Sequence, residues 1–122
     1  SGSELAQMYA SLDIFIHTGQ HETFCQSIQE ALASGVPVIA PNLGGPIDLV
    51  QDGVTGYLIN TGNYKEIRRV VRLIQSSDLA LLRKLTRASV VQRTWSSINQ
   101  ELIGHYRDLI KLNISQGTEL VA

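Results

Sequence analysis

Two glutamates mark a stretch whose residue types and spacing could bind a sugar derivative. Glu22 and Glu30 lie in HETFCQSIQE, residues 21–30, with seven residues between them. If a helix runs through this stretch, eight residues correspond to about 12 Å along its axis and an angular offset of about 80°. Both carboxylates could then line one side of a groove. A carboxylate accepts hydrogen bonds in pairs, so each would suit vicinal hydroxyls.

An anion site is expected between the two glutamates. Thr23 has a glutamine three residues later, the spacing of a capping box, which predicts that a helix starts at Thr23. The free amides of its first turn, near Phe24 and Cys25, would suit phosphate. A nucleotide sugar fits this order of groups, with its sugar near Glu22 and its ribose near Glu30. The alternative is that Glu22 only favours the helix dipole and Glu30 is a solvated surface residue.

The elements that would position these residues alternate between strand and helix patterns. We predict strands over residues 12–17, 36–40 and 56–59, the first of them buried. Helices are predicted over residues 3–11, 23–34, 47–51, 64–75, 78–93 and 95–112. In the helix at 23–34, Phe24, Ile28, Ala31 and Leu32 are expected to form the core stripe. The tail from Asn113 is expected to fray.

This order of elements predicts an α/β fold, with a parallel sheet covered on both faces. Three strands are few for a doubly wound sheet, and the chain opens on a helix. We therefore expect the second half of a larger Rossmann-like domain. In such sheets ligands bind beyond the carboxyl ends of the strands, which is where residues 17–23 fall.

Composition excludes several other classes of protein. The 122 residues are 43% hydrophobic and 17% charged, enough for one domain with a core. The formal net charge of −1 argues against a general nucleic-acid binder. We see no signal peptide and no apolar run long enough to cross a bilayer. The single cysteine, Cys25, excludes an internal disulfide and a multi-cysteine zinc site, and a reducing, cytoplasmic setting fits.

The wider segment ETFCQSIQEALASGVPVIAPNLGGPIDLVQDGVTGYLI resembles the C-terminal half of retaining GT-B glycosyltransferases of the glycogen-synthase-like kind. Their pattern is E-x7-E, a helix end A-x-G-x-P-V, a G-G turn, an acidic residue and D-G-x-x-G. The resemblance is close over residues 3–75 and continues loosely to Trp95 and Tyr106. The matching positions include Glu22, Glu30, Gly35, Pro37, Gly44, Gly45, Asp48, Asp52, Gly53 and Gly56.

The resemblance implies roles for particular residues. Glu22 is expected to be the catalytic residue that contacts the hydroxyls of the donor sugar, and Glu30 to bind the ribose. Further donor contacts are expected from Gly19, Thr23, Phe24, Cys25, Gly44 and Gly45. The family usually has glycine at the position of Cys25, so its side chain is expected to narrow the room beside the amides. No metal and no cofactor apart from the nucleotide-sugar donor is implied.

The resemblance also implies an architecture and an activity. We expect a Rossmann-like parallel sheet with flanking helices, the second half of a GT-B C-terminal domain, over residues 1–112, with C-terminal helices and a tail at 113–122. The motifs look most like GDP-mannose-dependent α-mannosyltransferases, which transfer to a glycan or glycolipid acceptor held by an N-terminal domain. The full enzyme is expected in the cytoplasm or at the inner face of the membrane, and this chain alone is predicted to be inactive.

Several alternatives stay open. The chain could be an inert nucleotide-sugar-binding or interaction module, or part of a GT-B epimerase. His17 could touch the donor or cap its strand through a local hydrogen bond. Gly44 and Gly45 could let backbone approach a ligand or only form a turn. The basic residues of the C-terminal helices are expected to be solvated rather than to form a lipid or nucleic-acid patch: Arg68, Arg69, Arg72, Arg83, Lys84, Arg87 and Arg93.

Overall fold

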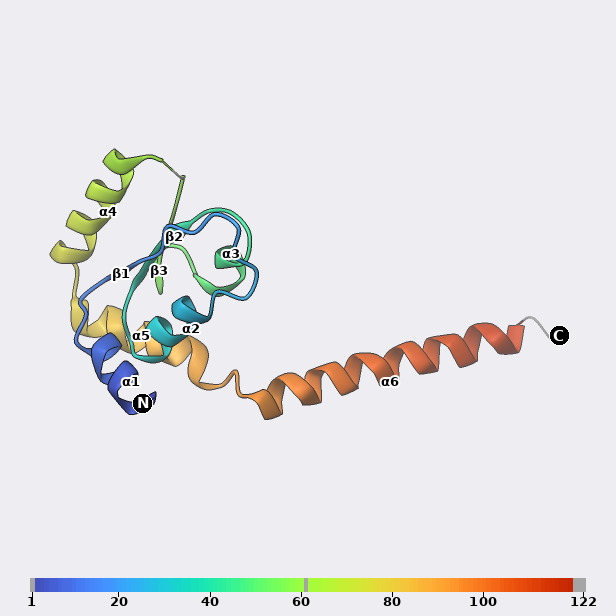
Figure 1. The fold of residues 1–122 in the computed structure, drawn as a ribbon. Helices are drawn as coiled ribbons and strands as arrows, with labels where there is room; N and C mark the ends of the chain where they lie inside the picture. Colours follow the sequence, from blue (N-terminus) through green and yellow to red (C-terminus); the bar gives the residue numbers. More distant parts are fainter. Residues whose placement is uncertain (1, 61, 120–122) are drawn as a thin grey trace. The chain divides into compact units, whose positions relative to one another are not determined.

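The computed structural model describes residues 2–60 and 62–119 (Figure 1). The chain forms two compact units, Ser1–Val91 and Gln92–Ala122. The first unit carries the sheet, and the second carries one long helix.

The sheet of the first unit is parallel, as predicted. Its strands are β1 (Phe15–Ile16), β2 (Val38–Pro41) and β3 (Gly56–Ile59), in the order β1-β2-β3. Phe15 pairs with Val38, and Val38 pairs with Gly56. The central strand β2 is buried along its whole length. The predicted boundaries of β3 are confirmed, and β2 begins two residues later than predicted.

The helices follow the predicted order. They are α1 (Gly2–Ala10), α2 (Gln26–Ala33), α3 (Pro46–Leu49), α4 (Tyr64–Ser76), α5 (Leu79–Val91) and α6 (Trp95–Glu119). The side chains of Asn63, Asp78 and Thr94 cap the first turns of α4, α5 and α6. Asn63 Oδ1 accepts a hydrogen bond from the Glu66 amide at 3.2 Å, and Asp78 Oδ1 accepts one from the Leu81 amide at 3.0 Å.

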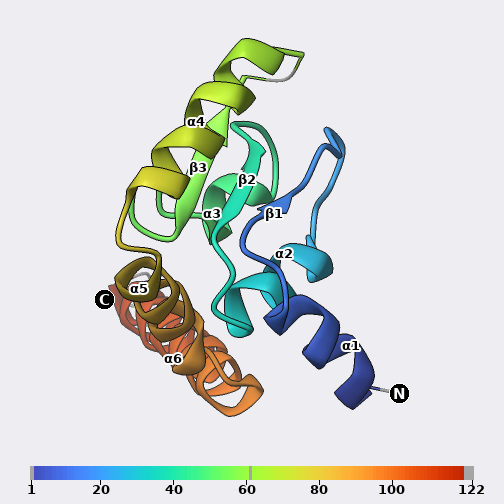
Figure 2. The ribbon, with the colours of Figure 1, turned by 90° about the vertical axis from the view of Figure 1, so that its left-hand side faces the viewer.

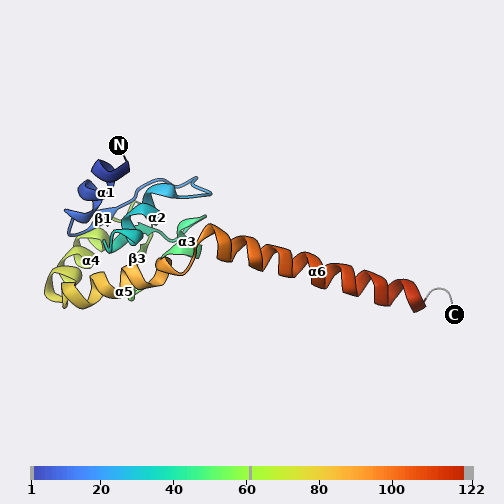
Figure 3. The same ribbon diagram turned by 90° about the horizontal axis from the view of Figure 1, so that it is seen from below.

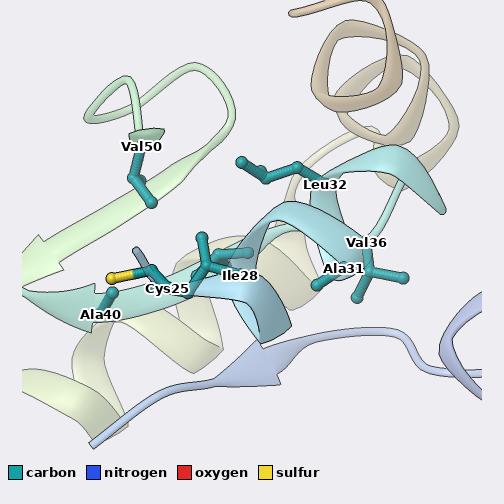
Figure 4. Close-up of a cluster of buried hydrophobic side chains, with 8 residues drawn as sticks. Cys25, Ile28, Ala31, Leu32, Val36, Ala40 and Val50 are labelled. Atoms are coloured by element: carbon teal, nitrogen blue, oxygen red, sulfur yellow. The ribbon is translucent and has the colours of Figure 1, made fainter. Parts of the chain in front are cut away.

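Helices cover both faces of the sheet, because successive residues of β2 point to opposite sides. On one face, Val38 and Ala40 pack against Ile28 and Leu32 of α2, and Figure 4 shows Ala40 beside this helix. On the other face, Ile39 packs with Val70 and Ile74 of α4. Figure 2 shows α4 alongside β3, with α2 on the other side of the sheet.

Two arginine side chains of helix α5 donate hydrogen bonds to backbone carbonyls of other parts of this unit. Arg83 donates hydrogen bonds to the carbonyls of Leu12 at 2.7 Å and Ala10 at 2.9 Å. Arg87 donates to the carbonyl of Ala33, at the end of α2, at 3.0 Å. Arg87 is exposed and Arg83 is partly exposed, and the hydrogen bonds that both make to backbone carbonyls were not predicted from the sequence. Figure 3, seen from below, shows α5 running across this end of the sheet.

Two predicted elements differ from the structure. The strand predicted over residues 12–17 shrinks to β1, and it is not buried, since 43% of the Ile16 surface is exposed. Among the described residues β1 pairs only with β2, so it is an edge strand. Helix α6 continues to Glu119 rather than fraying from Asn113. Its last turns contain no proline, and their polar residues cost a helix only some tenths of a kcal/mol each. Residues 120–122 of the predicted tail lie outside the described part.

Candidate functional site

The loop between β1 and α2, residues 17–25, carries most of the predicted site residues. It leaves the carboxyl end of β1, where the His17 amide donates a hydrogen bond to the Ile39 carbonyl at 2.8 Å. Farther along, the Glu22 carbonyl accepts a hydrogen bond from the Gly45 amide at 3.0 Å. Figure 2 shows the loop at the end of the sheet opposite to α5. The site residues therefore lie at the strand ends where ligands bind in parallel sheets.

Helix α2 begins at Gln26, three residues later than predicted. Cys25 precedes it in the left-handed region, with φ 50° and ψ 48°, and no side chain caps the helix in this described stretch. The prediction that a capping box starts this helix at Thr23 is therefore wrong. The amides of Ile28 and Gln29 both donate to the Cys25 carbonyl, at 3.0 and 3.1 Å. The first-turn amides that lack an intrahelical acceptor are therefore those of Gln26 and Ser27, rather than those of Phe24 and Cys25.

This shift of the helix start changes the geometry of the two glutamates. Glu22 lies in the loop, so the helical estimate of its separation from Glu30 does not apply. Phe24 also lies before α2, and 58% of its surface is exposed. It is therefore not part of the core stripe, whose other three predicted members are buried. Thr23 is exposed as well.

Cys25 is a core residue whose backbone faces the site. Only 1% of its surface is exposed, and it clusters with Ile28, Ala40 and Val50 (Figure 4). The expectation that its side chain narrows the space beside the amides is wrong, because the side chain fills core volume. Burial, and then the charge of Glu22, raise the pKa of the thiol. A raised pKa disfavours the thiolate, which is the form in which a cysteine acts as a nucleophile.

The Gly44-Gly45 turn packs directly beneath the loop. A Cβ added to Gly45 would lie 2.5 Å from the Thr23 carbonyl oxygen and 2.9 Å from the Cys25 sulfur. A side chain at this position would push the loop away from the sheet. Gly45 therefore does more than form a turn, because it allows backbone to approach backbone within the protein. Contact of either glycine with a donor remains a prediction.

The side chains of His17 and Glu22 both lie close to Gly19. A Cβ added to Gly19 would lie 2.8 Å from Nε2 of His17 and 3.0 Å from Cγ of Glu22. The imidazole Nε2 is buried and has no hydrogen-bond partner among the described residues. The local hydrogen bond by which His17 was expected to cap its strand is therefore not formed by this nitrogen. Gly19 leaves the space that both side chains occupy.

Glu30 is held by neighbours rather than freely solvated. Its carboxylate accepts a hydrogen bond from Gln26 Nε2 at 3.2 Å, and the residue is half-buried. Burial, followed by a hydrogen bond to Glu30 and the charge of that residue, raises the pKa of Tyr9 on α1. Sequence reasoning missed Tyr9, because nothing in the pattern links a residue of the first helix to a glutamate in the next.

The arrangement has the chemistry to bind a molecule that carries both hydroxyls and phosphate. Carboxylates accept hydrogen bonds from hydroxyls, and unpaired amides at a helix start attract anions. Among the described residues, no group of three His, Cys, Asp or Glu side chains could hold a metal ion. A search of the same residues finds no helix that is long and apolar enough to cross a membrane.

The sequence of this chain matches that of a known protein family. The sequence model of the family described as glycosyl transferases group 1 matches residues 1–89. The chain belongs to this family. The match covers every element of the sheet and the loop described above, so the predicted resemblance is confirmed.

Relatives within the glycosyl transferases group 1 family are similar over most of this chain. It is 47% identical over 110 residues to a GDP-mannose-dependent alpha-mannosyltransferase of Mycobacterium tuberculosis (strain CDC 1551 / Oshkosh), a match that covers 86% of this chain and 28% of that protein. An enzyme of the same name from Corynebacterium glutamicum is 44% identical over 114 residues, covering 92% of this chain and 28% of its own length. The chain thus spans under a third of these curated relatives.

Solved structures confirm the fold. The crystal structure of Anabaena HepE in complex with UDP and glucose superposes with a TM-score of 0.73 at 27% identity. The likeness covers 86% of this chain and 30% of that one. The structural neighbours are GT-B glycosyltransferases, so the predicted Rossmann-like, GT-B architecture is confirmed.

Proposed function

We propose that this chain is the nucleotide-sugar donor-binding part of a retaining glycosyltransferase. The observation that carries the proposal is the extent of similarity to mannosyltransferases, 44–47% identity over nearly the whole chain. The chemistry of the region supports the proposal, because Glu22 and the free amides at the start of α2 follow the carboxyl end of β1, and Glu30 lies farther along the same helix. The donor favoured by these relatives is GDP-mannose.

In this proposal each group has one task. Glu22, on the loop, contacts the hydroxyls of the transferred sugar. The amides of Gln26 and Ser27 receive the diphosphate, since they are the first-turn amides left without an intrahelical acceptor. Glu30, held by Gln26 and Tyr9, accepts hydrogen bonds from the ribose. Six further residues shape the loop and offer backbone contacts to the donor: Gly19, Thr23, Phe24, Cys25, Gly44 and Gly45.

The full protein would transfer mannose to a glycan or glycolipid acceptor. The acceptor would be held by an N-terminal domain, and the reaction would take place in the cytoplasm or at the inner face of the membrane. This chain alone is expected to show no transfer, because in this proposal the acceptor is held by the N-terminal domain.

One observation favours a second donor class. The Anabaena neighbour was crystallised with UDP and glucose, so a uridine nucleotide is the competing ligand. Calorimetric titration of the chain with GDP, GDP-mannose, UDP and UDP-glucose separates the two. We expect guanine nucleotides to bind more tightly than uridine nucleotides.

The same titration with two variants tests the site itself. Glu30→Gln keeps the side-chain volume and removes the charged acceptor, and we expect it to weaken GDP binding about tenfold, the loss of one charge-assisted hydrogen bond. Glu101→Gln, on the exposed face of α6, is the matched control and should bind as the parent does. Equal affinities of the parent and Glu30→Gln would contradict the assignment of the ribose to Glu30.

A further inference from the structure

A line of cations runs along the exposed face of α4 and belongs to no part of the proposed donor site. Three arginines follow Lys65 at spacings of three, four and seven residues, so the four side chains share one side of the helix: Arg68, Arg69 and Arg72. All four are exposed, and together they line a shallow hollow of the surface. We call this row the α4 stripe.

The α4 stripe is not neutralised by the protein. Within the part of the chain that the structure describes, none of its four side chains has an ion-pair or hydrogen-bond partner. Glu66 is the only acid in α4, and its Oε2 is engaged by the Asn60 amide at 3.1 Å. The chain carries a formal net charge of −1, so this local surplus of positive charge runs against the balance of the whole.

The other cations of the chain have different surroundings. Arg83 and Arg87 donate hydrogen bonds to backbone carbonyls at the ends of α1 and α2. The remaining four are scattered over several elements rather than sharing one face: Lys84, Arg93, Arg107 and Lys111. Four of the ten Lys and Arg residues are thus concentrated on two turns of one helix.

We propose that the α4 stripe binds the surface of a membrane that contains anionic phospholipids, which replaces the expectation from the sequence that Arg68, Arg69 and Arg72 form no lipid patch. A straight row on a convex helix can touch a flat, negatively charged surface with all four side chains at once. Tyr64 and Leu73, 74% and 41% exposed, flank the row about 90° to either side. Aromatic and apolar side chains beside cations suit the headgroup region.

The opposite face of α4 sets the mode of binding. Val70 and Ile74 are buried against the sheet, so the helix cannot turn its apolar face toward lipid. Attraction to the membrane is therefore electrostatic, without deep insertion, and salt should screen it. A nucleic acid is the less favoured partner, because nucleic-acid-binding domains carry an overall basic surplus, whereas this chain has a formal net charge of −1.

Vesicle flotation of the full 122-residue chain tests this proposal. We expect binding to phosphatidylcholine vesicles that contain about 30 mol% phosphatidylglycerol, no binding to pure phosphatidylcholine, and release near 0.5 M salt. Each cation near such a surface contributes roughly fivefold to partitioning, so Arg68→Gln with Arg72→Gln should lower it roughly 30-fold. Neutralising all four residues should abolish binding.

A matched control separates the α4 stripe from net charge. Replacing Lys84, Arg93, Arg107 and Lys111 by Gln changes the net charge equally and should leave partitioning within about threefold. Circular dichroism of each variant establishes that the fold is kept. Equal losses in both four-residue variants, no binding by the parent, or binding to a DNA duplex in preference to the vesicles would each overturn the proposal.

Discussion

At the scale of single residues, Cys25 joins the core to the proposed site. Its backbone adopts the left-handed region, which favours glycine, and its side chain is sealed in the core beneath the loop. A non-glycine residue in that region costs on the order of 1–2 kcal/mol. Burying the side chain offsets part of this cost. The buried side chain of Cys25 thus anchors the loop to the core.

The thiol of Cys25 should be unreactive while the chain is folded. Burial and the nearby Glu22 raise its pKa above the ordinary value of 9.0, so at pH 8 less thiolate is present than in the unfolded chain. We expect labelling by a disulfide reagent at pH 8 to be at least about tenfold slower in buffer than in urea. Labelling at the same rate in both conditions would show that the side chain is accessible.

Gly45 should tolerate no side chain. A methyl group there would overlap the Thr23 carbonyl and the Cys25 sulfur. Gly45→Ala is therefore expected to lower the free energy of unfolding by about 2 kcal/mol, within the usual cost of overpacking. Gly104→Ala is the control, since a Cβ at that helical position has nothing within 4 Å. If urea unfolding shows the two variants to be equally stable, the loop is not packed against this turn.

At the scale of elements, α5 links parts that are distant in the sequence. Arg83 donates to carbonyls 71 and 73 residues earlier in the chain, at the end of α1 and just after it. Since a cation near the last carbonyls of a helix satisfies groups that have no intrahelical partner, α1 depends on α5 for its position. Tyr9 on α1 in turn contacts Glu30.

Removal of the hydrogen bonds from Arg83 should lower the free energy of unfolding. Arg83→Ala is expected to lower the free energy of unfolding by about 1–2 kcal/mol, because it leaves two carbonyls without their charged donor. Lys84→Ala, at the next and exposed position, should change it by less than about 0.5 kcal/mol. Urea denaturation compares the two variants. A larger loss from the lysine than from the arginine would contradict the link.

The elements also indicate how far sequence reasoning reaches. The boundaries of β3 could be predicted because a turn at Asp52-Gly53 precedes it and its apolar run is short. The start of α2 could not, because the conformation of Cys25 depends on its burial in a core formed by distant residues. The extent of β1 depends on which residues find a pairing partner in β2, and no local pattern encodes this.

For the site, the sequence allowed the two glutamates and the loop glycines to be identified, but not their neighbours. The spacing of Glu22 and Glu30 matched a family pattern, whereas Tyr9 and the orphaned Nε2 of His17 emerge only from packing. The free amides were expected at Phe24 and Cys25, but because the helix starts later they are those of Gln26 and Ser27. Long-range contacts, rather than local preference, account for each of these differences.

At the scale of the whole molecule, stability resides in the first unit. Both hydrophobic clusters consist of residues before position 91. We therefore expect a chain that lacks residues 95–122 to unfold cooperatively, with a melting temperature within about 4 °C of the parent, the shift that corresponds to about 1 kcal/mol. Thermal circular dichroism measures this. Non-cooperative melting of the shortened chain would contradict a self-sufficient first unit.

The location of nucleotide binding is tested most directly by amide chemical shifts during titration with GDP. We predict that the largest changes fall on residues 17–30, led by the amides of Gln26 and Ser27, with smaller changes along α4. Changes concentrated on Lys65, Arg68, Arg69 and Arg72 would mean that GDP binds only as an anion on the α4 stripe. That result would contradict a donor site at the carboxyl edge of the sheet.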